Sequence, residues 1–282
     1  MNEIGGVIPV LATPFDECGD VDLDSFDGQV EMAIRDGADG LAMFGLASEY
    51  YNLMDSERQV LLRRLVSVVG QKIPVIISVA HHATELAIRQ AREAQDAGAD
   101  AIMILPPFFL EPSEEAILEH IACVAGAVGI PSILQYAPAQ TRISSEILAS
   151  LPVSMVKIDA VPFAPAAAML PSGCLRLAGY MGLDLPDAVA ADCRGCMPTA
   201  SLAPQFRRLW DLLRRDPEQG REYHAGLLPL LQFMMQSIEF LARCEKHLLL
   251  RRKAIRSAHS RRPMASLEPA QVHLLYRYLD DL

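Results

Sequence analysis

Eight short apolar runs, separated by longer amphipathic segments, constrain the fold of this chain more than any other feature of its sequence. Each run is apolar almost throughout instead of alternating with polar residues, which is typical of parallel strands buried on both faces. The runs are residues 6–12, 40–45, 74–80, 101–106, 131–136, 154–159, 175–180 and 195–200. The pattern predicts a parallel sheet that is covered by helices on one face and filled by side chains on the other.

The segments between these runs carry the signals of amphipathic helices. Asp55-Ser56-Glu57-Arg58 begins a segment whose apolar residues recur at helical spacing, and Thr84 with Glu85 begins the next, which ends at Gly98. Eight strands that are each followed by a helix predict an α/β protein of the (β/α)8 TIM barrel type, and the eighth unit ends near residue 215.

The chain beyond residue 215 contains no strand-like run. Residues 227–250 predict a helix, and Ser266-Leu267-Glu268-Pro269 predicts the start of a last helix that ends at Leu282. We therefore expect a barrel over residues 1–215 and a C-terminal helical extension over residues 216–282, joined at Asp216-Pro217-Glu218.

Composition excludes several classes of protein. With 282 residues, of which 51% are hydrophobic, the chain is too apolar to be disordered, and a net charge of −10 argues against a nucleic-acid partner. The N-terminus lacks the basic region of a signal peptide, and no apolar run is long enough to cross a bilayer. The six cysteines form no dense disulfide framework. We expect a soluble, cytoplasmic protein that binds neither nucleic acid nor membrane.

Lys157 is the most unusual residue of the predicted barrel. Only four of the 25 basic residues are lysines, and Lys157 alone lies in an apolar strand. The others lie in polar or Arg-rich stretches, where a solvated charge is expected: Lys72, Lys246 and Lys253. Because side chains alternate along a strand, Lys157 shares a face with Met155 and Asp159. We expect this face to point into the barrel, near the C-terminal strand ends where barrel enzymes carry their active sites.

Two roles fit a lysine in that position. Burial disfavours an ammonium ion, and a neutral amine attacks a carbonyl carbon to form a Schiff base, whose iminium withdraws electrons from the bonds that react. The alternative is a structural lysine, held in a buried ion pair with Asp159 or Glu49.

Several motifs, in chain order, resemble those of the dihydrodipicolinate synthase / N-acetylneuraminate lyase family. Gly6-Val7 with Thr13-Pro14-Phe15-Asp16 resembles the family's first strand and turn, and Pro107-Phe108-Phe109 resembles its Pro-Tyr-Tyr segment. Val156-Lys157-Ile158-Asp159 is similar to the family's Ile-Lys-Glu motif, whose lysine forms a Schiff base with pyruvate. The resemblance implies a barrel enzyme in which Lys157 is the nucleophile and which requires no cofactor and no metal.

The resemblance also assigns a loop to the carboxylate of the 2-oxo acid, where the family has Gly-Thr-Thr-Gly-Glu. The matching residues here are Gly45, Leu46, Ala47, Ser48 and Glu49. The paired threonines correspond to Leu46 and Ala47, whose side chains cannot donate a hydrogen bond. Backbone N–H groups of the loop, with the Ser48 hydroxyl, would then bind the carboxylate, and Glu49 would order the loop.

Further departures concern the proton relay of the family. Gln135 replaces its relay tyrosine and Phe109 replaces the tyrosine that supports it, and an amide is a poor acid or base. Tyr136, Tyr50 and Tyr180 are candidates to restore an acid–base group, although none lies at the position of the family's tyrosine. Arg142 lies two residues beyond the position of an arginine that often binds a substrate carboxylate. Met197 lies in a segment similar to the eighth strand, where a backbone carbonyl comes close to the lysine.

We therefore expect a Schiff-base lyase or aldolase acting on pyruvate or a related 2-oxo acid and an aldehyde, with altered substrate recognition. The resemblance implies a homo-oligomer, either a dimer or a tetramer. Two other hypotheses stay open. One is a metal-dependent barrel enzyme using His81 with Glu49 and Asp159, and the same rim histidine could instead act as a base on the substrate. The other is a non-catalytic barrel that lost its relay and binds a ligand.

Overall fold

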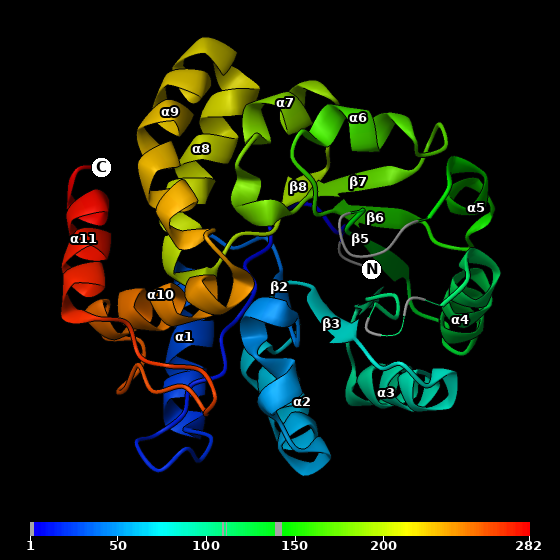
Figure 1. Cartoon of the computed structure of the whole chain (residues 1–282), viewed down its shortest axis with the longest axis horizontal. Helices are drawn as coiled ribbons and strands as arrows, with labels where there is room; N and C mark the ends of the chain where they lie inside the picture. The colour runs from blue at the N-terminus through cyan, green and yellow to red at the C-terminus, as the bar shows by residue number, and fades with distance from the viewer. Residues whose placement is uncertain (1–2, 109, 111, 139–142) are drawn as a thin grey trace.

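Eight parallel strands curl into a barrel with helices outside, as the computed structural model in Figure 1 shows. The structure describes residues 3–108, 110, 112–138 and 143–282. Every strand lies within one of the eight predicted runs, so the predicted fold is confirmed. The strands are β1 (Gly6–Val7), β2 (Leu41–Met43), β3 (Val75–Val79), β4 (Ala101–Ile104), β5 (Ser132–Tyr136), β6 (Met155–Ile158), β7 (Leu175–Ala178) and β8 (Gly195–Cys196).

The barrel closes between short strands. The pairing order is β1-β8-β7-β6-β5-β4-β3-β2, and an isolated bridge between Val10 and Ala42 joins the two ends of that order. In the β1–β8 pair, Gly6 lies opposite Gly195. A Cβ atom at Gly195 would lie 2.5 Å from the Gly6 carbonyl oxygen, so this closure requires glycine.

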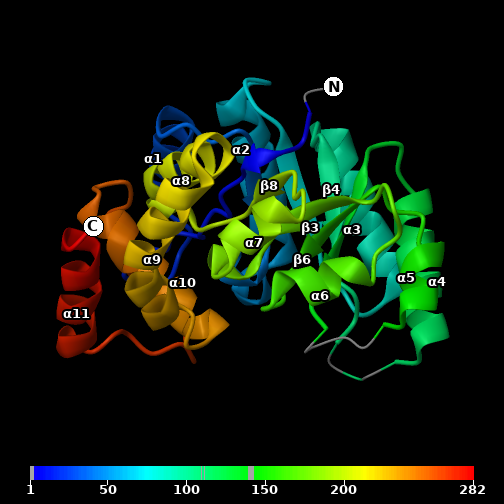
Figure 2. The ribbon, with the colours of Figure 1, turned by 90° about the horizontal axis from the view of Figure 1, so that it is seen from above.

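Helices surround the sheet, and their ends follow local sequence signals (Figures 1 and 2). Asp22 and Ser113 cap two of them by accepting a backbone N–H from the first turn, while Gly70 and Gly98 end two others in the left-handed conformation. The barrel helices are α1 (Leu23–Arg35), α2 (Asp55–Val69), α3 (Thr84–Ala97), α4 (Glu114–Gly126), α5 (Ser145–Ser150), α6 (Phe163–Ala168), α7 (Leu185–Ala190) and α8 (Ala203–Arg215). Four short 3-10 turns complete the barrel: η1 (Leu46–Ser48), η2 (Tyr50–Asn52), η3 (Tyr180–Gly182) and η4 (Ala200–Leu202).

Two apolar cores hold the layers together. The larger lies between the sheet and the helices, and the smaller fills the inside of the barrel. The inner core consists of residues that alternate along the strands with those of the outer core, as the near-continuous apolar runs predict. Its buried members are Ile4, Ile8, Val10, Ala42, Ile76, Ala101, Met103, Ile133, Met155, Leu177 and Met197.

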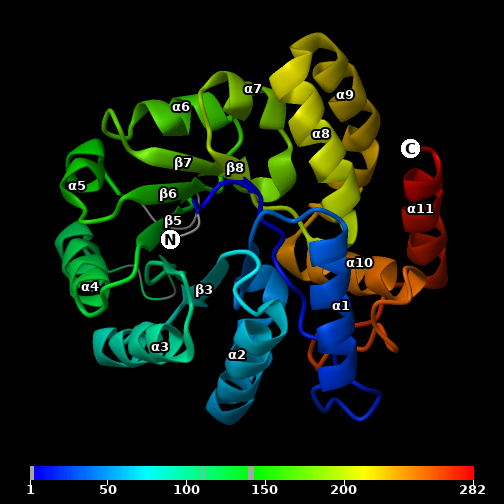
Figure 3. The ribbon, with the colours of Figure 1, turned by 180° about the vertical axis from the view of Figure 1, so that it is seen from behind.

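Three helices of the C-terminal segment pack on one side of the barrel, beside α1 and α8 (Figure 3): α9 (Pro217–Met234), α10 (Ile238–Arg251) and α11 (Pro269–Asp280). The helix predicted over residues 227–250 is broken, because Ser237 caps the start of α10 by accepting the Phe240 N–H at 3.0 Å. The break bends α9 against α10 by 113°. In the described part of the chain, no single helix has the length and apolar composition to cross a membrane, whereas the bent pair does when taken together.

Candidate active site

Lys157 lies inside the barrel near the C-terminal ends of the strands, as the alternation along its strand predicts. It belongs to β6, its register partner on β5 is Gln135, and its exposed fraction is 8%. Gln135 is also buried, and its side chain points to the same side of the sheet. The register therefore places a primary amine and an amide side by side within the barrel.

Asp159 connects these two side chains. Its Oδ2 atom accepts a hydrogen bond from Lys157 Nζ at 2.9 Å and one from Gln135 Nε2 at 2.7 Å. The structural ion pair considered for Lys157 is thus present, with Asp159 as the partner. The side-chain amide oxygen of Gln135, Oε1, is buried and has no hydrogen-bond partner among the described residues. It remains an acceptor for a hydroxyl group of a bound molecule.

The turn after β7 fixes the other oxygen of Asp159. The Tyr180 N–H donates to Asp159 Oδ1 at 2.9 Å, and a Cβ atom at Gly179 would collide with that oxygen. Tyr180 and Met181 both adopt the left-handed conformation, with φ of 48° and 53°. This conformation costs a non-glycine residue about 1–2 kcal/mol. The hydrogen bond to Asp159 helps to hold this turn, which lines the cavity.

A cavity of about 220 Å³ opens in front of Lys157. Six residues predicted for the site line it: Gly45, Leu46, Ala47, Gln135, Lys157 and Met197. Asp159 and the turn between α9 and α10 line it as well. The sequence analysis missed that turn because only the packing of the C-terminal helices brings it over the barrel. The lining residues are Met235, Gln236 and Ser237 of the turn, with Ile238 and Leu241 of the start of α10.

The loop over residues 45–49 forms one wall of the cavity. The Ser48 and Glu49 N–H groups donate to the carbonyls of Gly45 and Leu46, and Thr13 Oγ1 donates to the Ser48 carbonyl at 2.6 Å. The N–H groups of Leu46 and Ala47 begin η1 and take no part in its internal hydrogen bonds. Neither N–H group donates to a backbone carbonyl of the described residues.

Ser48 and Glu49 do not line the cavity. Both are fully buried behind it, and Glu49 forms an ion pair with Lys246 at 2.5 Å between Oε1 and Nζ. The Ser48 hydroxyl is therefore not available to a carboxylate in the cavity. The expectation that Lys246 is solvated was wrong, because its side chain is 0% exposed. A charged residue in a polar helical stretch is normally solvated, and only the tertiary packing shows otherwise.

The expectation for Tyr136 fails on geometry. Tyr136 follows Gln135 on β5 and so points to the opposite face, into the core between sheet and helices, where its hydroxyl lies 3.7 Å from Met169 Sδ. Burial raises the pKa of this phenol. Phe109 and Arg142 lie outside the described residues.

The histidines of the predicted rim do not reach the cavity that holds Lys157. His81 and His82 line a small separate cavity with Tyr50 and Phe108, and His81 Nδ1 accepts the Ala83 N–H at 3.0 Å. Across the described residues, no three side chains of His, Cys, Asp or Glu come together as a group that could hold a metal ion. The donors considered for a metal site are engaged elsewhere, since Asp159 bonds Lys157 and Glu49 bonds Lys246.

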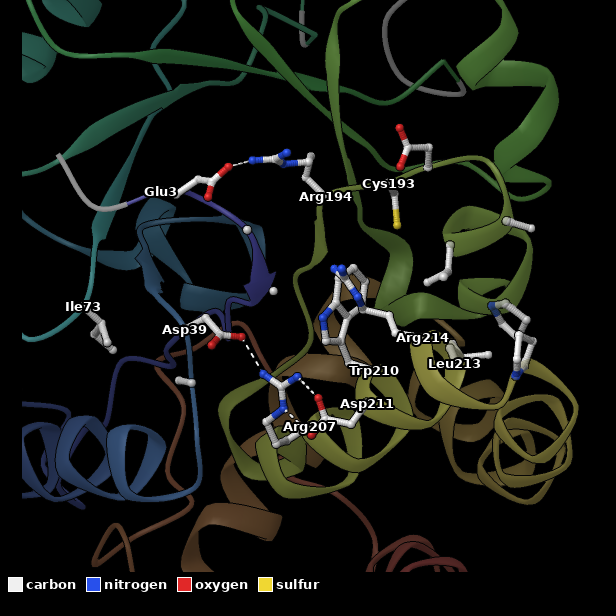
Figure 4. Close-up of a pocket in the computed structure, with 18 of the residues that line it drawn as sticks. Glu3, Asp39, Ile73, Cys193, Arg194, Arg207, Trp210, Asp211, Leu213 and Arg214 are labelled. Carbon is white, nitrogen blue, oxygen red and sulfur yellow. Dashed lines mark hydrogen bonds and ion pairs between the residues drawn. The ribbon is translucent and has the colours of Figure 1, made fainter.

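A larger cavity, of about 1030 Å³, lies at the opposite end of the barrel, where the strands begin (Figure 4). Several of its charged side chains neutralise one another: Arg207 bonds Asp39 at 2.6 Å and also Asp211, and Arg194 pairs with Glu3. Barrel enzymes carry their active sites at the C-terminal ends of the strands. We therefore take the smaller cavity, with its amine and carboxylate, as the candidate active site.

Comparison with known proteins relates the whole chain to one family. The model of the Dihydrodipicolinate synthetase family matches residues 3–156, which ends one residue before Lys157. L-2-keto-3-deoxyarabonate dehydratase of Azospirillum brasilense is 30% identical over 98% of this chain and 95% of its own length. 4-hydroxy-tetrahydrodipicolinate synthase 2 of Halalkalibacterium halodurans is 27% identical over 82% of each chain. Among solved structures, a putative dihydrodipicolinate synthetase from Pseudomonas aeruginosa superposes with a TM-score of 0.91 at 25% identity, over 99% of both chains.

Proposed function

Because the chain belongs to the Dihydrodipicolinate synthetase family, we propose that it is a Schiff-base lyase that acts on a 2-oxo acid through Lys157. One observation carries this proposal: a primary amine, 8% exposed, lies in a cavity at the C-terminal end of the barrel beside a carboxylate. The N–H groups of Leu46 and Ala47 would receive the substrate carboxylate, which brings the 2-oxo carbon towards Lys157.

The first half of the reaction forms the iminium. The amine attacks the 2-oxo carbon, a proton moves to the carbonyl oxygen, and loss of water leaves a C=N bond that carries a positive charge. Asp159 lies 2.9 Å from the Lys157 nitrogen and is the base that can take the proton the ammonium must lose. It returns this proton to the carbinolamine hydroxyl, which leaves as water, so the carboxylate is free to take the proton from C3 in the next step. The iminium then lowers the barrier to loss of a proton from C3, which gives an enamine.

We propose that the bond broken next is a carbon–oxygen bond at C4, so that the reaction is a dehydration. The enamine electrons expel the C4 hydroxyl, which takes up the proton that Asp159 had accepted from C3 and leaves as water. Water then hydrolyses the conjugated iminium and returns Lys157. Aldol cleavage would instead require a base for the C4 hydroxyl proton, which is the role of the family's tyrosine. Gln135 stands at that position, and an amide is a poor base.

Two further observations support the dehydration. Gln135 lines the cavity, and its side-chain oxygen Oε1 has no hydrogen-bond partner among the described residues, so this oxygen can accept a hydrogen bond from a substrate hydroxyl. The dehydratase of Azospirillum brasilense also aligns over nearly the whole chain. We therefore propose a 2-oxo-3-deoxy sugar acid as the substrate class, with no metal and no cofactor taking part.

The test is covalent trapping. The protein is incubated with pyruvate or a 2-oxo-3-deoxy sugar acid, reduced with borohydride and weighed intact. We expect one adduct per chain, absent from Lys157→Ala and retained in Lys72→Ala. The proposal would be overturned if none of the 2-oxo acids gave an adduct, or if the adduct persisted in Lys157→Ala.

The products then separate dehydration from cleavage. Dehydration yields one product lighter than the substrate by one water, whereas cleavage yields pyruvate and an aldehyde. Mass spectrometry of the reaction mixture distinguishes the two outcomes, and the appearance of pyruvate would contradict the carbon–oxygen assignment.

We also propose that the enzyme works in the cytoplasm as a homo-oligomer. All six cysteines are free thiols, which agrees with a reducing compartment. The homo-oligomer is expected from the family alone. Light scattering of the purified protein measures its mass in solution and so the number of chains in the assembly.

A further inference from the structure

We propose that Lys246 is a positioning residue of the active site: its buried ion pair with Glu49 fixes the cavity wall over residues 45–47 and thereby sets the affinity for the 2-oxo acid. This inference rests on the proposed function of the cavity. It gives helix α10, far along the chain from Lys157, a part in binding the substrate.

The pair is buried on all sides. Both side chains are 0% exposed, and Nζ of Lys246 also donates to the His259 carbonyl at 2.9 Å and to Ser260 Oγ at 3.2 Å. The ring of Phe15 lies 4.5 Å from the same nitrogen. Burial lowers the pKa of Lys246, and the charge of Glu49 opposes this effect. A protein is often just as stable when apolar side chains of similar size replace a buried ion pair. The stability of the fold alone therefore does not explain why this chain has Lys246 and Glu49 here.

Glu49 occupies a position where the backbone must be held. It lies between η1 and η2 with φ of 56°, a left-handed conformation that is uncommon for a residue with a side chain. Its N–H donates to the Leu46 carbonyl, and its Oε2 accepts a hydrogen bond from Asn52 Nδ2 at 3.3 Å. The charge of Lys246 therefore holds the residue that ends η1, two positions from Ala47 in the cavity wall.

The same helix reaches the cavity directly. Ile238 and Leu241, in the first turn of α10, line the cavity that residues 45–47 also line, and the helix contacts η1. Lys246 lies more than one turn further along. Ile238 and Leu241 of α10 thus form part of the cavity wall, and Lys246 of the same helix holds the loop that forms another part of it. The width of the cavity between these two parts therefore depends on the ion pair between Lys246 and Glu49.

A matched control is available on the same helix. Arg252, at the end of α10, bonds Asp36 at 2.7 Å and the Ser201 carbonyl at 2.9 Å, and it anchors the helix to α1 and η4. Among the described residues, neither of these Arg252 hydrogen bonds involves residues 45–49. Arg252→Met loosens the extension in general, whereas Lys246→Met and Glu49→Gln remove the pair itself.

The experiment measures the pyruvate concentration that half-saturates borohydride trapping. We expect it to rise about tenfold or more in Lys246→Met and in Glu49→Gln, with the same maximal adduct, because the loop contributes binding that is lost before chemistry. The double variant should be no worse than the worse single variant, since both remove one interaction. Arg252→Met should keep the wild-type value. If Lys246→Met does not fold, Glu49→Gln decides the outcome.

Hydrogen exchange of the peptide over residues 44–53 gives a second readout that does not depend on activity. We expect faster exchange there in Lys246→Met and not in Arg252→Met. Unchanged exchange, an unchanged half-saturation, or an equal rise in Arg252→Met would overturn the positioning role. A wild-type protein that forms no adduct with any 2-oxo acid would overturn the proposed function, and the inference with it.

Discussion

Asp159 bonds both Lys157 and Gln135, so its replacement separates covalent binding from turnover. We expect Asp159→Asn to form the borohydride adduct still, though more slowly, because the nucleophile remains while its base is lost, and we expect turnover to fall about 100- to 10,000-fold with the loss of a general base. Steady-state rates and intact mass on the same preparation measure the two effects. Asp96→Asn, on the exposed face of α3, is the control. Wild-type turnover in Asp159→Asn would contradict the role of this carboxylate.

Single residues show where sequence reasoning succeeds and where it stops. The alternation along β6 predicts that Lys157 and Asp159 face the inside of the barrel, because strand geometry is local. The same alternation along β5 directs Tyr136 to the outside of the barrel if Gln135 points to its inside. The expectation that both residues serve one site therefore conflicts with the geometry of the strand. The burial of Lys246 leaves no local signal, because it arises from packing between distant segments.

At the scale of elements, Arg261 fastens the segment before α11 to the start of α2. It forms two hydrogen bonds with Glu57, and these bonds lower the pKa of that carboxyl from its ordinary 4.5, against the opposing effect of burial. The unfolded chain therefore binds more protons here than the folded protein. The contribution of the pair to the free energy of unfolding is complete above pH 4.5 and is lost as the pH falls through the folded-state pKa.

Glu57→Gln tests this contribution. We expect the free energy of unfolding at pH 7 to fall by about 1–2 kcal/mol, since a hydrogen bond to a charged group is removed. The difference from wild type should shrink as the pH falls below 4.5. Chemical denaturation at several pH values measures both effects. Asp27→Asn removes the more exposed pair with Arg64 and is expected to change stability less. A difference that does not depend on pH would contradict the account.

Strands were predicted better than the C-terminal helices. Each strand is specified by its own apolar run, whereas α9 and α10 form one apolar stretch in the sequence, with the break marked only by Ser237. That break brings Ser237 and Ile238 over the cavity. The part of the site that the sequence analysis missed therefore belongs to the element whose boundary it missed.

The whole molecule depends on closure of the barrel at its shortest strands. A Cβ atom at Gly195 would lie 2.5 Å from the Gly6 carbonyl oxygen, between β8 and β1. We expect Gly195→Ala to lower the free energy of unfolding by about 3 kcal/mol, because the backbones cannot separate without breaking the ladder. Gly226→Ala, in α9, meets no atom within 4 Å and should stabilise the protein by about 0.5–1 kcal/mol. Equal stability of the two variants in denaturant would contradict this account of closure.

The location of the trapped adduct tests the central claim most directly. The chain has four lysines that could react with a 2-oxo acid: Lys72, Lys157, Lys246 and Lys253. Of these four, only Lys157 lines the cavity at the C-terminal ends of the strands. After trapping with pyruvate and borohydride, digestion with a protease that cleaves after arginine and not after lysine leaves each of them in a separate peptide. We predict that the added mass is found on the peptide that contains Lys157 and on no other. Its presence on Lys72 or Lys253, with Lys157 unmodified, would contradict the assignment of Lys157 as the Schiff-base residue.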